Sequence, residues 1–302
     1  MVRLLLFCLL LSLTPLGVFP QTDAAIKQRF KSKNYTVTWG NRPSYPADSE
    51  LVIGYGSGHG GSLGWLRFRP IEGGVEVLSI ELDPGWHPSK SKWSPDVVPV
   101  AVKRGPMAKQ AYASLLHDLA IVKSGRLKAI QRNSVSMSSA NFWVASRLVF
   151  RDRTLLNWNW AGYAGSFDEI EYAKPNAAVD LARAKIAKLP LKEHSLSVEE
   201  RRWASAKFIE DWNELSAREF YWWVAERLIM LSGQTGDFTV LPKLREIMSG
   251  PLTGSPSDRR VYYAINAITR ITGKDVRPKP VEEMDLESTR RRVLDTLSEM
   301  EK

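Results

Sequence analysis

The glycine-rich run at residues 54–64 contains a spacing that is typical of a nucleotide-binding loop. Gly56, Gly58 and Gly61 match the dinucleotide-binding pattern, in which a glycine loop follows a strand and leads into a helix. The N-terminus of that helix holds the pyrophosphate, so the motif depends on it. Residues 63–68 alternate like a strand instead. We therefore expect a flexible glycine-rich hairpin and predict no cofactor.

Ser62 lies in the same run and could act as the nucleophile of a serine hydrolase. Gly60, Ser62 and Gly64 match the nucleophile-elbow spacing, which also requires a helix directly after the serine. A hydrolase needs a histidine base, and His59 is too near Ser62 in sequence to be presumed its partner. The other histidines have no flanking catalytic motif, and they are His87, His117 and His194. We predict no catalytic residue and keep a hydrolase using Ser62 or His59 as the alternative.

The sequence does not specify a metal site. It contains neither an HExxH motif nor two histidines four positions apart. Asp168, Glu169 and Glu171 form an acidic cluster, but a calcium loop needs six or more oxygens in a defined pattern. We interpret these carboxylates as solvated loop charges and predict no bound metal.

Two tryptophans could stack against a ligand from a loop. Trp86, His87 and Trp93 lie in a segment rich in proline, serine and lysine, where exposed rings are expected. Exposed indole rings can bind sugars or peptides by stacking. Trp158, by contrast, shares a strand face with Leu156 and is predicted to be a core residue. We therefore predict Trp86, His87 and Trp93 as ligand-binding residues.

Residues 103–132 are strongly basic and could attract an anionic partner. Asp118 is the single acidic residue in this stretch. The basic residues are Lys103, Arg104, Lys109, Lys123, Arg126, Lys128 and Arg132. Such charge suits a membrane surface or an acidic polymer, although exposed helices and strand edges also favour Lys and Arg for solubility. No nucleic-acid-binding motif accompanies the charge, so a nucleic-acid partner is disfavoured.

The N-terminal segment is typical of a secretory signal. Arg3 precedes an apolar run at residues 4–13, which is too short to span a bilayer stably. Small residues at Thr22 and Ala24 predict cleavage after Ala24, with an uncleaved anchor as the alternative. Cleavage would remove Cys8, the single cysteine of the chain, and with it any disulfide or thiol chemistry. With no second apolar stretch of spanning length, we expect an exported periplasmic or extracellular protein.

The predicted secondary structure that must position these residues changes from mainly strands to helices near residues 190–196. Before that point, β-branched and aromatic runs separated by Gly and Pro predict strands. These lie at residues 35–39, 51–55, 63–68, 75–82 and 97–102, with a hairpin formed by 142–150 and 155–160. Helical spacing predicts two helices, at residues 107–122 and 175–189, the second with Pro175 in its first turn. The pattern predicts an α+β domain with a mainly antiparallel sheet at residues 25–192.

Helix-start signals dominate after residue 192. Ser197 with Glu200 and Ser216 with Glu219 fit the capping box, in which side chains satisfy free backbone donors. Asp285 precedes the last helix. Further helices are predicted at residues 240–248 and 286–297, and a cap at Ser255–Pro256. Residues 193–302 are therefore predicted to form an all-α domain.

A self-comparison gives this helical segment a period of about 40 residues. The shift superposes two segments, residues 218–233 and 260–273, which end in Gly233 and Gly273. The matched pairs are Trp222 with Tyr262, Trp223 with Tyr263, Leu228 with Ile268 and Leu231 with Ile271. The segment resembles a HEAT-like or armadillo-type repeat, with an ordinary helical bundle as the alternative. The whole chain resembles uncharacterised exported bacterial proteins with a helical-repeat tail.

The HEAT-like resemblance implies a stacked helical-hairpin surface used for protein or peptide contact, and it implies no catalytic residues. We therefore expect an exported, non-enzymatic binding or scaffold protein. A serine-type hydrolase at residues 54–64 and a peripheral binder of anionic polymer or membrane through residues 103–132 are the alternatives.

Overall fold

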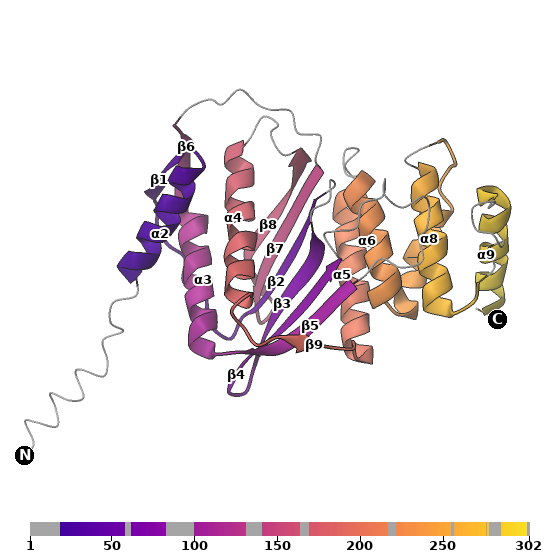
Figure 1. Ribbon diagram of the computed structural model, residues 1–302, viewed down its shortest axis with the longest axis horizontal. Helices are drawn as coiled ribbons and strands as arrows, with labels where there is room; N and C mark the ends of the chain where they lie inside the picture. Colours follow the sequence, from indigo (N-terminus) through magenta and orange to yellow (C-terminus); the bar gives the residue numbers. More distant parts are fainter. Residues whose placement is uncertain are drawn as a thin grey trace, which may run out of the picture.

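A seven-stranded sheet forms the middle layer of the computed structural model, with helices on both faces (Figure 1). Helices α3 and α4 cover one face, and the helices after residue 197 stand against the other. This arrangement confirms the predicted α+β fold with a sheet first and helices after it. The structure describes residues 19–57, 62–82, 100–130, 141–163, 169–216, 222–254, 257–275, 277 and 285–300.

The sheet is antiparallel throughout, with the order β8-β7-β2-β3-β4-β5-β9. Its strands are β2 (Glu50–Ser57), β3 (Leu63–Ile71), β4 (Gly74–Leu82), β5 (Val100–Met107), β7 (Asn141–Phe150), β8 (Arg153–Tyr163) and β9 (Lys192–Glu193). The predicted hairpin of β7 and β8 is confirmed, with Arg151 at its turn in the left-handed region. The start of the first predicted helix is wrong, because Met107 ends β5 in register with Val75.

Both faces of the central strands are buried. On β3, Leu63 and Trp65 face the later helices, whereas Leu66 and Phe68 face α3 and α4. All four side chains have 0 % exposure. Alternation therefore divides the sheet residues between two hydrophobic clusters, one on each side.

Helices α3 (Lys109–Ser124) and α4 (Glu169–Ile186) cover the first face. Leu115, Leu119 and Val122 of α3 are fully buried against it, as their helical spacing predicts. The predicted start of the second helix is wrong, because α4 begins at Glu169 and holds Pro175 in its interior. An interior proline removes one backbone hydrogen bond of the helix. Burial of Ala173, Ala177 and Ala178 in the hydrophobic cluster of this face compensates by holding the helix on the sheet.

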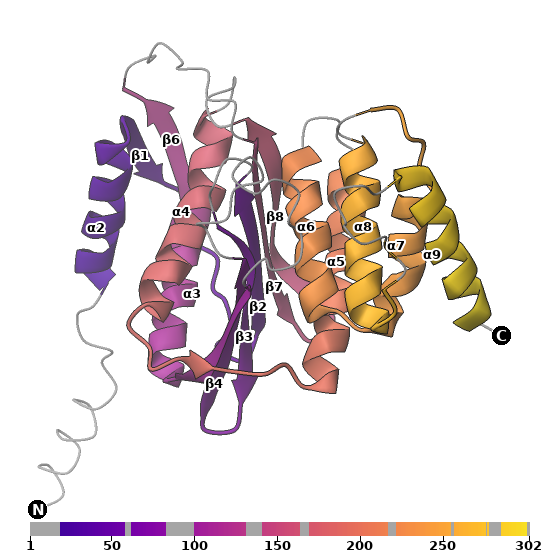
Figure 2. The ribbon, with the colours of Figure 1, turned by 45° about the vertical axis from the view of Figure 1, so that its right-hand side comes forward.

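The later helices lie beyond the second face of the sheet, and the first two of them stand next to it (Figure 2). They are α5 (Val198–Ser216), α6 (Trp222–Thr235), η2 (Phe238–Val240), α7 (Leu241–Met248), α8 (Ser257–Thr272) and α9 (Leu286–Met300). Phe208 of α5 and Leu228 of α6 belong to the same hydrophobic cluster as Trp65 and Trp143 of the sheet. The hydrophobic cluster on this side therefore contains residues from both predicted domains.

The two glycines of the repeat comparison have different roles. Gly273 ends α8 with a positive φ of 69° and donates its N–H to Thr269, as expected for a helix terminator. Gly233 does not end its helix, because α6 continues to Thr235. A Cβ at Gly233 would lie 2.7 Å from Cα of Ala267, so this glycine allows α6 and α8 to pack closely.

The glycine-rich run lies in an antiparallel β2–β3 hairpin, as predicted, and residues 58–61 lie outside the described residues. Gly54 and Gly56 lie in β2, and Gly64 lies in β3. A Cβ at Gly54 would lie 2.4 Å from the ring of Trp143, and a Cβ at Gly64 would lie 2.2 Å from the carbonyl oxygen of Ile80. These glycines are required for packing inside the sheet.

A helix and a two-stranded ribbon lie beyond α3 at the N-terminal side and share the hydrophobic cluster of this face (Figure 1). They are α2 (Phe19–Ser32) and the ribbon of β1 (Tyr35–Trp39) and β6 (Gly125–Ala129). Ile26 and Phe30 of α2 are buried with Tyr35 and Val37 of β1. The predicted cleavage point after Ala24 falls inside α2. Among the described helices, none is long and apolar enough to cross a membrane.

Candidate functional site

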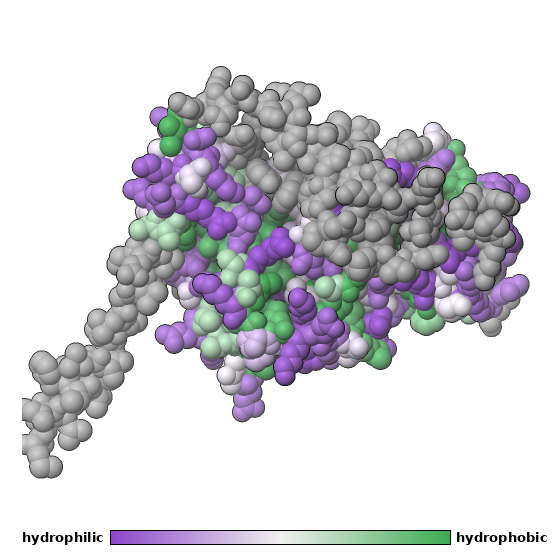
Figure 3. All heavy atoms as spheres, viewed as in Figure 1, coloured by the Kyte–Doolittle hydropathy of each residue, from purple (hydrophilic) through white to green (hydrophobic). Residues whose placement is uncertain are grey.

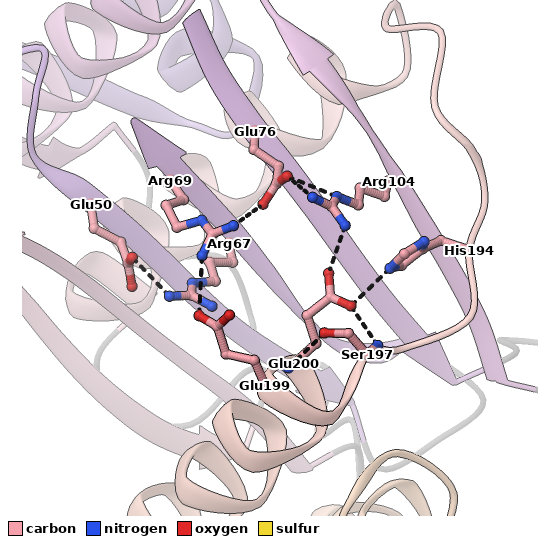
Figure 4. Close-up of polar contacts among 9 residues, drawn as sticks. All are labelled: Glu50, Arg67, Arg69, Glu76, Arg104, His194, Ser197, Glu199 and Glu200. Atoms are coloured by element: carbon pink, nitrogen blue, oxygen red, sulfur yellow. Dashed lines mark hydrogen bonds and ion pairs between the residues drawn. The ribbon is translucent and has the colours of Figure 1, made fainter. Parts of the chain in front are cut away.

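Charged side chains on four neighbouring strands face the first turn of α5 (Figure 4). Arg67 and Arg69 continue the face of β3 that begins with Leu63 and Trp65, so this face changes from apolar to charged along the strand. We call this group the charged seam. Its members are Glu50, Arg67, Arg69, Glu76, Arg104, His194, Glu199 and Glu200.

Glu76 is at the centre of the charged seam. Its Oε1 accepts a hydrogen bond from Arg69 at 2.7 Å, and its Oε2 accepts one from Arg104 Nε at 2.8 Å. The same arginines reach the helix, where Arg69 pairs with Glu199 at 3.3 Å and Arg104 with Glu200 at 3.5 Å. Each charged side chain of the seam has an opposite partner within it. The seam therefore fastens α5 to the sheet.

The predicted capping box at the start of α5 is confirmed and is part of the seam. Glu200 accepts a hydrogen bond from the N–H of Ser197 at 2.7 Å, and its own N–H donates to Ser197 Oγ at 3.2 Å. His194 Nε2 lies 2.8 Å from Glu200 Oε2, the same oxygen that accepts the N–H of Ser197. Burial alone would raise the pKa of Glu200, but the bonds from Ser197 and His194 outweigh it and hold the pKa below its usual value.

Acidification is expected to remove the contribution of Glu200. Because its folded pKa lies below the unfolded value of 4.5, its stabilisation is complete above that pH and is lost as the pH falls through the folded pKa. Glu200→Gln should therefore be less stable than the wild type at pH 7, and the two should converge on acidification. Urea unfolding across this range measures the difference. Glu199→Gln, at a side chain 79 % exposed, should keep the wild-type pH slope, and parallel profiles for Glu200→Gln would refute the assignment.

A buried ion pair joins α5 to the apolar part of the same sheet face. Lys207 Nζ lies 2.6 Å from Asp211 Oδ1, and Trp65 Nε1 donates to Asp211 Oδ2 at 2.8 Å. The exposed fractions of Lys207 and Asp211 are 7 % and 2 %. Burial raises the pKa of Asp211 to about 6, and the bonds from Lys207 and Trp65 limit that rise.

A pocket with a volume of about 490 Å³ opens where α5 begins and where α6 and α8 end. We call it the end pocket. It is lined by Arg201, Gly233, Gln234, Gly236, Asp237, Phe238, Arg270 and Ile271. The N–H of Gly236 donates to Ser232 at 2.8 Å, so the last turn of α6 continues to the pocket wall.

The carboxylate in the end pocket is already engaged. Asp237 accepts hydrogen bonds from Thr239 N–H and from Ser205 Oγ, each at 3.0 Å, and lies 3.9 Å from Arg202. Burial would raise the pKa of Asp237, but these bonds and the nearby arginine hold it below its usual value. Asp237 therefore caps η2 and stays charged near neutral pH.

Two arginines and one aromatic ring of the end pocket are available to contact a ligand. Arg201 uses one N–H, which donates to the carbonyl of Gln234 at 3.3 Å. Arg270 is exposed and has no ion pair with a residue that the structure describes. Phe238 is 57 % exposed. The carboxyl ends of α6 and α8 carry partial negative charge, which the arginines offset. The pocket can therefore hold a carboxylate beside an apolar group.

The end pocket lies outside every site predicted from the sequence. Its residues come from α5, the end of α6, η2 and the end of α8, and they carry no motif. The exposed Phe238 in a polar connection is the one sequence signal that could have marked it.

The predicted basic residues do not form one continuous surface. Arg104 is paired in the charged seam, and Lys103 points to the opposite face of β5. Lys109 begins α3 and Lys123 is in its last turn, about 21 Å further along the helix. Arg126 and Lys128 follow on β6, and Arg132 lies outside the described residues.

Of the predicted catalytic and ligand-binding residues, the structure describes Ser62 alone. Ser62 directly precedes β3, so the helix that a nucleophile elbow or a dinucleotide loop needs does not follow it. His59, Trp86, His87 and Trp93 lie outside the described residues. Among the residues that are described, no three His, Cys, Asp or Glu side chains are grouped to hold a metal ion.

The fold and the end pocket define an α+β protein with a helical layer that offers an open, partly basic pocket. Comparison with family models, curated proteins and solved structures found no match to this chain.

Proposed function

We propose that this is an exported binding protein whose helical layer holds an acidic segment of a partner protein in the end pocket. The observation that carries the proposal is the pairing of Arg201 and Arg270 with exposed Phe238 around one cavity of about 490 Å³. Guanidinium groups bind carboxylates through two parallel hydrogen bonds, which favours acidic side chains or a chain terminus.

The form of the pocket supports a peptide rather than a fully enclosed small molecule. Ligand pockets for small molecules bury most of the ligand, whereas this one opens at the ends of α6 and α8. An extended segment can place one carboxylate between the arginines and an apolar side chain against Phe238. The resemblance to HEAT-like repeats, which implies protein or peptide contact, agrees with this proposal.

Removal of one guanidinium is expected to weaken binding of an acidic peptide. We would measure the fluorescence anisotropy of a fluorescein-labelled peptide of alternating glutamate and phenylalanine. Arg270→Gln should raise the Kd about tenfold, because a hydrogen bond to a charged group contributes about 1.5–3 kcal/mol. Phe238→Ala should weaken binding by a similar factor through lost apolar contact.

Arg291→Gln is the matched control, since Arg291 is 74 % exposed on α9 and lies outside the end pocket. It should bind the peptide like the wild type, and a lysine–phenylalanine peptide should not bind. Equal Kd values for Arg270→Gln and Arg291→Gln would contradict the proposal. Hydrolysis of a chromogenic ester that is lost in Ser62→Ala would favour the hydrolase alternative instead.

A further inference from the structure

The outer face of the β1–β6 ribbon is basic and exposed. Thr36 pairs with Lys128, and Thr38 pairs with Arg126, so these four side chains share one face. All four are exposed, while Tyr35 and Val37 on the inner face are buried against α2. On the neighbouring helix α2, Lys27 and Lys31 are exposed as well. We call Lys27, Lys31, Arg126 and Lys128 the basic flank.

The basic flank lacks compensating acids. No Asp or Glu occurs in residues 24–47 or 119–151, and the ribbon pairs one of these stretches with the other. Asp180 of α4 pairs with Arg29 and Lys33, which are outside the flank. Within the described part of the chain, no acidic group forms an ion pair with any of the four flank residues.

Two further lysines extend the positive charge toward α3. Lys174 Nζ donates to the carbonyl of Lys123 at 3.3 Å, and Lys123 Nζ lies 5.2 Å from the ring of Trp158. Burial lowers the pKa of both lysines, and the charge of Lys123 lowers that of Lys174 further. Hydrophilic residues cover much of this side of the molecule (Figure 3).

An exposed apolar side chain on this side favours a lipid surface over a soluble polymer. Ile130 follows β6 and is 50 % exposed beside the basic strand. A bilayer interface accepts apolar side chains below its headgroups and attracts lysine and arginine with its negative charge.

We propose that the basic flank binds anionic phospholipid headgroups and holds this side of the protein against a membrane surface. This proposal is independent of the end pocket, which lies at the ends of α6 and α8. The guanidinium group of Arg126 and the ammonium group of Lys128, on the outer face of the ribbon, bind lipid phosphates, and the exposed Lys27 and Lys31 of α2 add positive charge beside the ribbon.

The test measures sedimentation of the full chain with vesicles of phosphatidylcholine alone or with one-third phosphatidylglycerol. Binding that does not depend on headgroup charge is equal for both kinds of vesicle, so the difference between them reports on the basic flank. The double variant Arg126→Gln with Lys128→Gln should reduce the phosphatidylglycerol-dependent affinity about thirtyfold, from about fivefold for each charge near the surface. High salt should reduce the wild-type affinity in the same way.

The matched control is Lys188→Gln with Lys192→Gln, which removes two exposed positive charges elsewhere. It should bind vesicles like the wild type. The proposal is overturned if wild type binds both vesicles equally, or if the two double variants lose the same affinity. It is also overturned if heparin, but no anionic vesicle, binds in a manner that depends on Arg126 and Lys128.

Discussion

Replacement of Asp211 with alanine is expected to lower the free energy of unfolding by about 3–5 kcal/mol, the cost of leaving a buried charge unpaired. Lys207 would lose a carboxylate at 2.6 Å, and the buried N–H of Trp65 would lose its acceptor at 2.8 Å. Glu210 remains near Lys207 at 3.4 Å, but it is 49 % exposed and replaces little of the interaction. Urea unfolding followed by tryptophan fluorescence measures the loss.

The double variant Asp211→Ala with Lys207→Met distinguishes the cost of the unpaired Lys207 charge from the cost of lost packing. It should recover part of the loss, since an apolar replacement of a buried ion pair is often neutral or stabilising. Arg147→Ala is the surface control, because its partner Glu210 is 49 % exposed and such pairs contribute at most about 1 kcal/mol. A double variant no more stable than Asp211→Ala would show that Lys207 is not held by Asp211.

Gly64→Ala is the second change for which we expect a large effect, a loss of about 3 kcal/mol or more. The added Cβ would lie 2.2 Å from the carbonyl oxygen of Ile80 and 3.0 Å from Cα of Glu81. Both atoms belong to the backbone of β4, so they cannot move without disturbing the β3–β4 ladder. Thermal unfolding of the variant should show a lower Tm in proportion.

Gly56→Ala is the matched control in the same glycine run. Its Cβ would meet the side chain of Leu63 at 3.0 Å, and a leucine methyl can turn away at low cost. We expect less than half the loss found for Gly64→Ala. Comparable losses at both positions would mean that the close approach of β4 is not what requires glycine at residue 64.

Most of the fold is predictable because its signals are local. Alternation on β7 and β8 and the Ser197–Glu200 capping box depend on residues within a few positions of each other, and both are confirmed. The errors arise where distant contacts override local preference. Pro175 lies inside α4, where the buried alanines keep the helix continuous. Gly233 lies inside α6 and does not end it, and glycine is required there because a side chain would collide with Ala267 of α8.

The sites are less predictable for a geometric reason. The charged seam needs Arg69, Glu76 and Arg104 on one face of three strands, and the sequence shows their charge but not their register. The end pocket needs Arg201, which is 69 positions before Arg270, to meet it at the end of α8. Neither arrangement has a local pattern. The glycine run had such a pattern, and strand packing accounts for it at Gly54 and Gly64.

The strand order also governs how quickly the chain can reach its native state. β2 pairs with β3 next to it in sequence, but also with β7, where Gly54 lies opposite Ala145. The β2–β7 pairing closes a long loop. The entropy cost of that closure comes before the strand contacts can stabilise the pair, so folding is slowed. During synthesis the β3–β4 hairpin can form early, whereas β2 keeps an open edge until β7 emerges. Until then the glycine-rich edge of β2 is open to mispairing with other chains.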